Sequence, residues 1–254
     1  MAFTLNERLA DKSKPFLFSW MSMAGTQLAA QMARLPIEGV CLDLQHGMMG
    51  FPDATGMIAA INAAGRSAIV RVLWNDPGLV GQCLDAGAAA VIAPMVNSRA
   101  QAEALVHAAK YPPMGGRSWG GYTATQASGL TAAQYLKQAN GMTKVFAMIE
   151  TQAALDAVEE IASVPGLDGL FVGPSDLSIA LSNGAELNRV SEKNLVAMKR
   201  IAAAAQKNNL IAGAFAGTSD IVKTYQAMGY SFMAAAVDVE LLQAGAAKFM
   251  KDLG

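Results

Sequence analysis

Residues 145–173, VFAMIETQAALDAVEEIASVPGLDGLFVG, contain two short apolar runs with a helical pattern between them. The runs Val145–Ile149 and Gly169–Gly173 are apolar on both faces, which is typical of parallel strands that are buried on both sides. Apolar residues in Ala153–Ile161 recur at helical spacing. The stretch therefore predicts successive units of a βα repeat.

The same alternation continues along the whole chain. Six more apolar runs predict strands, at Phe16–Trp20, Val40–Leu44, Ala68–Leu73, Ala90–Met95, Ile211–Phe215 and Phe232–Val237. Further helical spacing occurs in Met57–Ala64, Ala100–Ala109, Asn194–Gln206 and Ile221–Met228. Eight strands in 254 residues leave about 32 residues per unit, which favours an α/β fold with a single (β/α)8 TIM barrel domain over residues 1–254. A doubly wound Rossmann-like sheet is the alternative, but no GxGxxG follows the first strand.

One connection is longer than a single helix needs. About 47 residues, 96–142, separate the fourth and fifth predicted strands. Within them, residues 111–130 (YPPMGGRSWGGYTATQASGL) are predicted to form an extended glycine-rich loop with one charged residue, Arg117. This loop is a candidate lid or intersubunit element, and a decorated surface loop is the alternative. Its residues lack the order of a phosphate-binding P-loop.

The composition excludes several classes of protein. Nineteen Lys and Arg against twenty Asp and Glu, without a basic stripe, argue against nucleic acid as a partner. The first fifteen residues lack a signal-peptide core and no run of eighteen apolar residues occurs, so we expect a cytoplasmic protein without a membrane partner. Cys41 and Cys83 have no metal or disulfide spacing and are predicted to be packing residues. With 53% apolar and only 15% charged residues, we expect an interface between subunits.

Two carboxylates follow neighbouring predicted strands. Catalytic groups of such barrels lie at the C-terminal ends of the strands, where Glu150 and Asp176 occur. Adjacent strands lie about 4.8 Å apart, so both could hold one Mg²⁺ or Mn²⁺ ion. Each could equally cap the helix that follows its strand, and the spacing leaves both readings open.

Other polar residues lie at the same predicted rim or need a partner. His46 follows a strand and is a candidate general base, with a structural histidine as the alternative; His107, in a helical stretch, is read as structural. Arg71 lies in an apolar strand, so it either pairs with a carboxylate such as Asp43 or binds an anionic substrate. Asp85 is expected near a helix C-terminus, where the helix dipole disfavours it and a partner is needed.

The order and spacing of several motifs closely resemble those of the HpcH/HpaI aldolases, which are divalent-metal, pyruvate-dependent aldolases. The resemblance runs from about residue 39 to 238 and is carried by GVCLDLQHG (39–47), VRVLWNDP (70–77), CLDAGAAAVIAPMV (83–96), YPPMGGRS (111–118), MIET (148–151) and GLDGLFVGPSDLS (166–178). The related citrate lyase β-subunit and malyl-CoA lyase group shares the barrel but generally lacks the DxxHG and GPSDLS pair.

The resemblance implies a role for each matching residue. It implies His46 as the catalytic base, Asp85 as the acid that raises its basicity, and Arg71 as the cation that stabilises charge on the substrate. It implies Glu150 and Asp176 as the ligands of a divalent metal ion (Mg²⁺, Mn²⁺ or Co²⁺), without an organic cofactor. Asp43 is expected to support the site, and the substrate is expected to bind along GPSD, comprising Gly173, Pro174, Ser175 and Asp176.

The implied reaction is the reversible aldol cleavage of a 4-hydroxy-2-oxo acid to pyruvate, or a close 2-oxo acid, and an aldehyde, through an enolate that the metal stabilises. The resemblance also implies a homo-oligomer, commonly a hexamer built as a trimer of dimers, with C-terminal helices exchanged between subunits. The apolar tail 239–250 fits that expectation. In some members the position of Asp85 and the glycine-rich loop complete the active site of a neighbouring subunit.

Two positions depart from the family pattern, and the acceptor aldehyde is left undefined. Gln45 replaces a frequent glutamate, and Met148 replaces a glutamine that contacts substrate in some members. Aromatic residues that could shape the acceptor pocket are Trp119, Tyr122 and Phe215, and the single charge of the loop favours small or moderately polar aldehydes over dicarboxylates. A lysine Schiff-base aldolase is a rival class because Lys144 opens the fifth strand, but it lies at the end away from the predicted rim.

Overall fold

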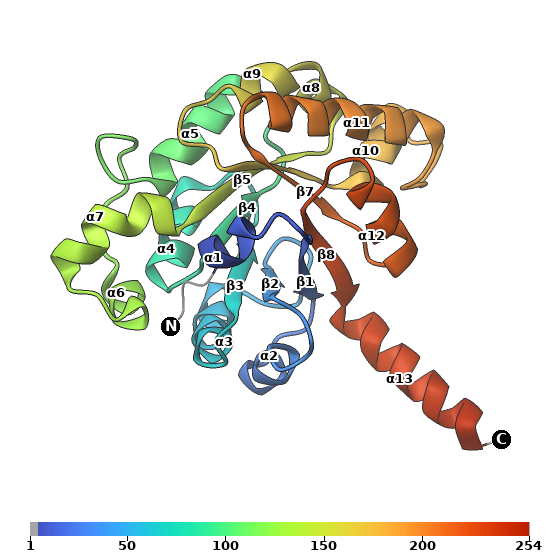
Figure 1. Cartoon of the computed structure of the whole chain (residues 1–254), viewed down its shortest axis with the longest axis horizontal. Coiled ribbons are helices and arrows are strands. Elements are labelled where there is room, and N and C mark those ends of the chain that lie inside the picture. The colour runs from blue at the N-terminus through green and yellow to red at the C-terminus, as the bar shows by residue number, and fades with distance from the viewer. Residues whose placement is uncertain (1–4, 254) are drawn as a thin grey trace.

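The computed structural model describes residues 5–253 and contains eight parallel strands closed into one barrel, with β8 paired to β1 (Figure 1). The predicted (β/α)8 TIM barrel is therefore confirmed. Every predicted strand is present, with its ends displaced by no more than two residues. The strands are β1 (Phe16–Met21), β2 (Gly39–Asp43), β3 (Ser67–Arg71), β4 (Ala90–Ala93), β5 (Lys144–Ile149), β6 (Gly169–Val172), β7 (Ile211–Phe215) and β8 (Phe232–Val237).

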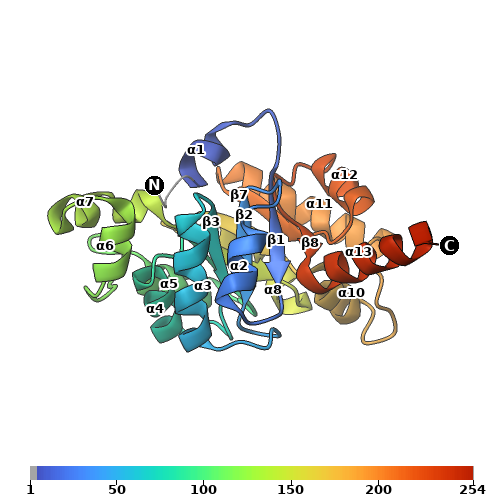
Figure 2. The same ribbon diagram turned by 90° about the horizontal axis from the view of Figure 1, so that it is seen from below.

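Helices surround the barrel and alternate with the strands (Figures 1 and 2). The predicted helix at residues 153–161 is two short helices, α8 and α9, which meet at Ala157. The helices are α1 (Leu5–Ala10), α2 (Thr26–Met32), α3 (Phe51–Ala63), α4 (Pro77–Asp85), α5 (Arg99–Ala109), α6 (Tyr122–Ser128), α7 (Ala132–Met142), α8 (Gln152–Asp156), α9 (Val158–Ala162), α10 (Pro174–Leu181), α11 (Glu192–Lys207), α12 (Ser219–Gln226) and α13 (Asp238–Leu253).

The long connection between β4 and β5 contains three helices, α5, α6 and α7. The glycine-rich segment 111–130 is irregular up to residue 121 and then forms α6, so it is only partly a loop. Helices α6 and α7 extend from one side of the barrel, and α13 extends from the other side in both views (Figures 1 and 2). The molecule thus has two projections that are not needed to close the barrel.

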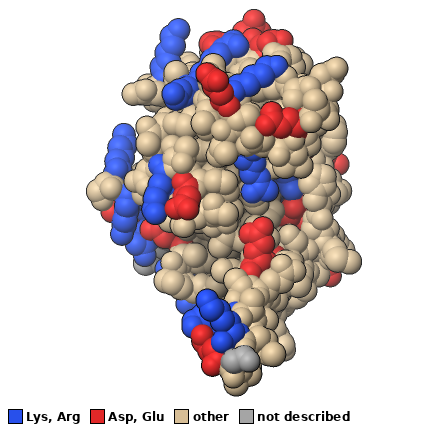
Figure 3. Space-filling view, turned by 90° about the vertical axis from the view of Figure 1, so that its right-hand side faces the viewer, with Lys and Arg blue, Asp and Glu red and all other residues tan. Residues whose placement is uncertain are grey.

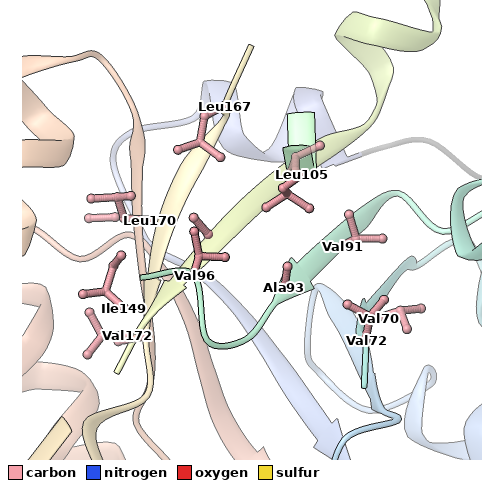
Figure 4. Packing of buried hydrophobic residues seen from close by; sticks show 14 of the residues in the cluster. Val70, Val72, Val91, Ala93, Val96, Leu105, Ile149, Leu167, Leu170 and Val172 are labelled. Carbon is pink, nitrogen blue, oxygen red and sulfur yellow. The ribbon is translucent and has the colours of Figure 1, made fainter. Parts of the chain in front are cut away.

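Two apolar layers form the core. The barrel interior is filled largely by aromatic rings, for example Phe146 stacked on Phe232 with ring centroids 4.5 Å apart. The second layer lies between strands and helices, where Leu105 of α5 packs near Val91 of β4 (Figure 4). Cys41 is buried in the inner layer and Cys83 in the outer one, and both are free thiols, which confirms the packing role predicted for them.

A buried ionic network joins several elements at the N-terminal ends of the strands. The Lys110 side chain, 1% exposed, donates from Nζ to Asp168 Oδ2 at 2.6 Å and to the carbonyl oxygens of Asn140 and Thr143, both at 2.9 Å. Asp168 Oδ2 also accepts from the Val145 N–H at 2.9 Å. This Lys110–Asp168 network ties the end of α5 and the end of α7 to the starts of β5 and β6.

Charges of both signs are scattered over a largely uncharged surface on the face drawn in Figure 3, which carries the C-terminal end of α13. Among residues 5–253, no helix is long and apolar enough to span a bilayer.

Candidate active site

A cavity of about 310 Å³ lies at the C-terminal ends of the strands, where the sequence predicted the catalytic rim. It brings together predicted residues from four separate motifs, and Phe215 also lines it. Several further residues were not predicted. Its lining is Trp20, Ser22, His46, Arg71, Met148, Gly173, Pro174, Ser175, Asp176, Arg189, Phe215, Val237 and Glu240.

Glu150 lies beside this cavity because of the register between β5 and β6. Ile149 pairs with Val172, so the next residues, Glu150 and Gly173, lie next to each other. A Cβ at Gly173 would lie 2.7 Å from Glu150 Oε2, so the glycine provides the space that this oxygen occupies. The other oxygen, Oε1, accepts from the Met95 N–H at 2.8 Å, with Met95 in the left-handed region at φ 58°. One carboxylate oxygen is thus held by backbone, and the other faces the glycine.

The environment of Glu150 disfavours its charge. Its side chain is buried, with 3% of the residue exposed, and this burial together with the nearby charge of Asp176 raises its pKa from 4.5 to about 7. The Met95 N–H and Arg71 lower this pKa, each with a smaller effect than burial. Two carboxylates close enough to repel each other at a barrel rim are suited to share a cation.

The capping alternative does not apply to Glu150. The side chain of Thr151, not that of Glu150, caps α8, with Oγ1 accepting from the Ala154 N–H at 3.0 Å. Asp176 lies in the first turn of α10 and is exposed. Within residues 5–253 no group of three His, Cys, Asp or Glu side chains could hold a metal by itself. Two carboxylates that leave the other positions to water and substrate fit an open Mg²⁺ or Mn²⁺ site.

Asp43 and Arg71 form a buried bidentate ion pair across β2 and β3. Their residues are register partners, and the guanidinium donates from Nε to Oδ1 at 2.9 Å and from Nη2 to Oδ2 at 2.7 Å. Trp20 Nε1 also donates to Oδ2 at 3.1 Å, and the indole ring lies 4.8 Å from the Arg71 guanidinium carbon. Burial raises the pKa of Asp43, but the hydrogen bonds and charge of Arg71 outweigh it and hold that pKa below its ordinary value. The sequence left open whether Arg71 pairs with a carboxylate such as Asp43 or binds an anionic substrate. The structure contains the pair with Asp43.

The same carboxylate shapes the turn that carries His46. Asp43 Oδ1 accepts the backbone N–H groups of Gln45 at 3.1 Å and His46 at 3.3 Å. A Cβ at Gly47 would clash with the Asp43 carbonyl oxygen, so this tight turn requires glycine. The exposed His46 side chain lines the cavity. The Oε1 atom of Gln45 is buried without a hydrogen-bond partner among the described residues.

Asp85 and Trp119 lie away from the cavity that contains His46. Asp85 ends α4, shortly before β4 begins at Ala90, and therefore lies toward the N-terminal ends of the strands. The expected partner is Arg117, whose Nη2 lies 2.5 Å from Asp85 Oδ1 and whose guanidinium carbon lies 4.6 Å from the Tyr111 ring centroid. Trp119 packs on Tyr111 at 5.7 Å between ring centroids. Neither Asp85 nor Trp119 lines the cavity that contains His46 of the same chain.

Five residues of the cavity lining were not predicted from the sequence: Trp20, Ser22, Arg189, Val237 and Glu240. Trp20 ends the predicted first strand, so the rule that catalytic groups lie at strand ends could have identified it. Arg189 lies in the irregular segment 182–191 between α10 and α11, where no periodic pattern indicates which way a side chain points. Only the folded chain places it at the cavity.

Comparisons with known proteins show what the chain is similar to. The family model described as HpcH/HpaI aldolase/citrate lyase matches residues 17–244. A hydroxypyruvate/pyruvate aldolase of Rhizorhabdus wittichii is 35% identical over 242 residues, covering 95% of each chain. A 2-dehydro-3,6-dideoxy-6-sulfogluconate aldolase of Pseudomonas putida is 34% identical over 91% of this chain and 89% of its own. A crystal structure of a family protein from Burkholderia cenocepacia superposes with a TM-score of 0.88 at 28% identity, covering 99% of both chains.

Proposed function

Because the chain belongs to the HpcH/HpaI aldolase/citrate lyase family, we propose that it is a metal-dependent aldolase, a carbon–carbon lyase, which reversibly cleaves 4-hydroxy-2-oxo acids to pyruvate or a close 2-oxo acid and an aldehyde. Relatives named hydroxypyruvate/pyruvate aldolase and 4-hydroxy-2-oxovalerate aldolase support this activity. The observation that carries it is the meeting of His46, Arg71 and Asp176 at one cavity with the buried Glu150 beside them.

Glu150 and Asp176 would hold the divalent cation, which is Mg²⁺, Mn²⁺ or Co²⁺ in this proposal. When bound, the cation supplies Lewis-acid polarisation of the donor carbonyl. The backbone N–H groups of Ser175 and Asp176, in the first turn of α10, face the donor carboxylate, because the N-terminus of a helix favours an anion. Gly173 and Pro174 set the direction in which this turn leaves β6.

The proton and charge transfers are assigned to two residues. His46 takes the 4-hydroxyl proton in the cleavage direction, which starts the rupture of the bond between carbon 3 and carbon 4. Arg71, held in place by Asp43 and Trp20, stabilises the negative charge that develops on the pyruvate portion. Its fixed position means that little reorganisation is needed during the reaction.

The test combines methyl-proton exchange and carbon–carbon bond formation. We expect pyruvate to exchange its methyl protons in D₂O with Mn²⁺ or Mg²⁺ present, to stop doing so with EDTA, and to add to aldehydes. His46→Ala should slow aldol addition by about 10²-fold or more, as for other general bases. Rates within threefold of wild type would show that His46 does not have this role.

A lysine Schiff base is the rival mechanism. Lys144 Nζ donates to Gly141 O at 3.2 Å and lies 3.3 Å from Asp168 Oδ1, at the opposite end of the barrel from the cavity. Borohydride in the presence of pyruvate is therefore expected to leave Lys144 unmodified, as measured by mass spectrometry.

The assembly is proposed as a homo-oligomer, a hexamer built as a trimer of dimers, with α13 exchanged between subunits. Helix α13 projects from the barrel (Figure 1) and exposes Leu242, Phe249 and Leu253 to 58%, 65% and 68%. In the same proposal, Asp85, held by Arg117, is offered to His46 of a neighbouring subunit. The cytoplasmic location stays a prediction, which cell fractionation tests.

A further inference from the structure

Arg189 is a second cation at the cavity, and its backbone is firmly anchored. Its carbonyl oxygen accepts from Asn194 Nδ2 at 3.0 Å and from the Tyr225 hydroxyl at 2.9 Å. The preceding residue, Asn188, donates its N–H to Ser178 Oγ at 3.1 Å. Three elements, α10, α11 and α12, thus fix the point from which the Arg189 side chain enters the cavity.

The side chain is oriented by two contacts. Nε donates to Ser175 Oγ at 2.9 Å, and the guanidinium carbon lies 5.0 Å from the ring centroid of Phe215. Gly217, at φ +78°, leaves room for it, since a Cβ there would lie 3.1 Å from Nη1. These contacts use Nε and the face of the guanidinium but not its two terminal nitrogens.

The two arginines of the cavity differ in their pairing. Arg71 is neutralised by the bidentate Asp43, whereas no Asp or Glu among residues 5–253 forms an ion pair with Arg189. The other acids at the cavity are Asp176, assigned to the metal, and the exposed Glu240 of α13, which has no hydrogen bond to Arg189. An arginine with free terminal nitrogens matches the geometry of a carboxylate or a similar oxyanion.

Arg189 lies away from the place assigned to the donor substrate, pyruvate. The donor carboxylate is assigned to the backbone N–H groups at the start of α10, whereas Arg189 touches the side chain of Ser175 and extends over Phe215 at the end of β7. Trp20 meets Phe215 edge-on at 5.3 Å between ring centroids, which makes an apolar wall beside the cation. A molecule with an apolar middle and an anionic end fits this surface.

We infer that Arg189 is a specificity-determining residue that binds an anionic group, such as a terminal carboxylate, on the acceptor aldehyde. The inference rests on the proposed function and deepens it. It also revises the expectation, drawn from the loop around Arg117, that dicarboxylate products are disfavoured. The residue that decides this preference lies in 182–191 instead.

The experiment compares an anionic acceptor with a neutral one of similar length. With pyruvate and Mn²⁺, aldol addition to succinic semialdehyde and to butanal is measured for wild type, Arg189→Gln and Arg189→Lys. We expect Arg189→Gln to lower kcat/KM for succinic semialdehyde by about 10- to 100-fold, to change that for butanal by less than about threefold, and to leave the KM of pyruvate unchanged. Arg189→Lys should recover part of the loss, because the charge remains without the bidentate geometry.

A binding measurement makes the inference independent of turnover. The Mn²⁺-loaded protein is titrated with 2-oxoheptanedioate and with 2-oxoheptanoate, which differ in one terminal carboxylate. Wild type should prefer the dianion, and Arg189→Gln should lose that preference. Arg34→Gln, a matched change of an exposed arginine outside the cavity, should behave as wild type.

Three results would overturn the inference. Arg189→Gln could lose kcat/KM equally for both aldehydes, it could raise the KM of pyruvate, or wild type could bind both oxo acids equally. A wild type that binds the dianion through Arg189 but adds pyruvate to neither aldehyde would leave the anion site standing and refute the proposed aldolase reaction. The two failures are thus distinguishable.

Discussion

Glu150 is a residue at which burial and charge conflict. Its pKa of about 7 means that the folded, metal-free protein keeps a proton on this carboxyl over a range in which the unfolded chain has lost it. The folded state therefore binds more protons than the unfolded state between about pH 4.5 and 7, and its stability falls as the pH rises through that window.

The first prediction concerns this window. In EDTA, wild type should lose on the order of 3 kcal/mol of unfolding free energy relative to Glu150→Gln between pH 4.5 and 7, since glutamine cannot ionise. Denaturant titrations across this range measure the difference. Glu160→Gln, at an exposed acid that forms no ion pair within residues 5–253, should keep the wild-type dependence. Parallel curves for wild type and Glu150→Gln would contradict the raised pKa.

The same carboxyl makes metal binding depend on pH. Below pH 7 a cation has to displace the Glu150 proton, so the affinity for Mn²⁺ should fall by about tenfold for each pH unit as the pH is lowered. Calorimetric titration with Mn²⁺ at pH 6 and pH 8 measures this change. An affinity that is equal at both values would mean that Glu150 does not bind the ion.

The Asp43–Arg71 pair gives a second prediction at this scale. Asp43→Asn leaves the buried guanidinium without its charged partner and weakens the acceptor for the N–H groups of Gln45 and His46. We expect a loss of about 3 kcal/mol in unfolding free energy. Glu103→Gln, which breaks the exposed pair with Arg99, should cost less than about 0.5 kcal/mol by the same measurement. A similar loss of unfolding free energy in both variants would contradict the claim that the buried ion pair stabilises the fold more than the exposed one.

Residues at strand ends were predictable, whereas residues whose role depends on loops or other elements were not. The positions of His46, Arg71, Glu150 and Asp176 at the rim follow from the order of the strands in a parallel barrel, and their roles stay a prediction. Asp85 was expected to need a partner, and Arg117 provides it, but no spacing indicated that both lie away from His46 of their own chain.

The junction between β6 and α10 is the element on which the site depends most. Gly173 follows the last residue of β6, Pro174 starts the helix, and the missing Cβ leaves space for Glu150, which follows the adjacent strand β5. Strand register, helix start and carboxylate position are therefore coupled at one residue.

A third prediction tests that coupling. In Gly173→Ala the new Cβ would lie 2.6 Å from Met148 Cε and 2.7 Å from Glu150 Oε2, so the carboxylate must shift. We expect the affinity for Mn²⁺ to fall at least about tenfold, because a metal ligand displaced by a fraction of an ångström loses its geometry. Calorimetry measures it. Gly141→Ala, where a Cβ meets nothing within 4 Å, is the control. Unchanged affinity in Gly173→Ala would refute the coupling.

Strands were predicted better than helices for a physical reason. A short apolar run that is buried on both faces has few alternatives once its length excludes a helix, and all eight runs are strands. Helix ends depend on contacts that periodicity does not contain. Two examples are the break at Ala157 between α8 and α9 and the helix α6 inside a glycine-rich segment. Apolar periodicity predicted neither of them.

At the scale of the whole molecule, α13 is exposed from Glu240 onward, with no other part of residues 5–253 covering it. Asp238 anchors it, with Oδ2 accepting the N–H groups of Ser22 at 3.0 Å and Met23 at 2.9 Å, while the apolar residues further along are exposed. The anchor fixes the direction in which the helix leaves the barrel.

A fourth prediction follows for the assembly. Light scattering should give wild type a mass of several chains. The double variant Leu242→Asp, Phe249→Asp should approach the single-chain mass of 26.4 kDa. Its circular dichroism spectrum should stay that of the folded barrel, because exposed positions contribute little to the fold of their own chain. Lys248→Ala on the same helix should leave the assembly intact. A wild type of 26.4 kDa would contradict the proposed oligomer.

A fifth prediction addresses the position of Asp85. If it serves a neighbour's His46, then His46→Ala and Asp85→Asn subunits, co-expressed with different tags and purified as hybrids, should be more active than either parent. In each symmetric pair one site then has both residues intact. Hybrid activity no higher than that of the parents would place each site within one chain.

The Lys110–Asp168 network and the cavity lie at opposite ends of the barrel, so this network is separate from the contacts that select the acceptor. Substitutions at Arg189 and Phe215 should therefore leave this network intact. The chain is thus a suitable starting point for directed evolution toward new aldehydes, with the N-terminal ends of the strands left unchanged.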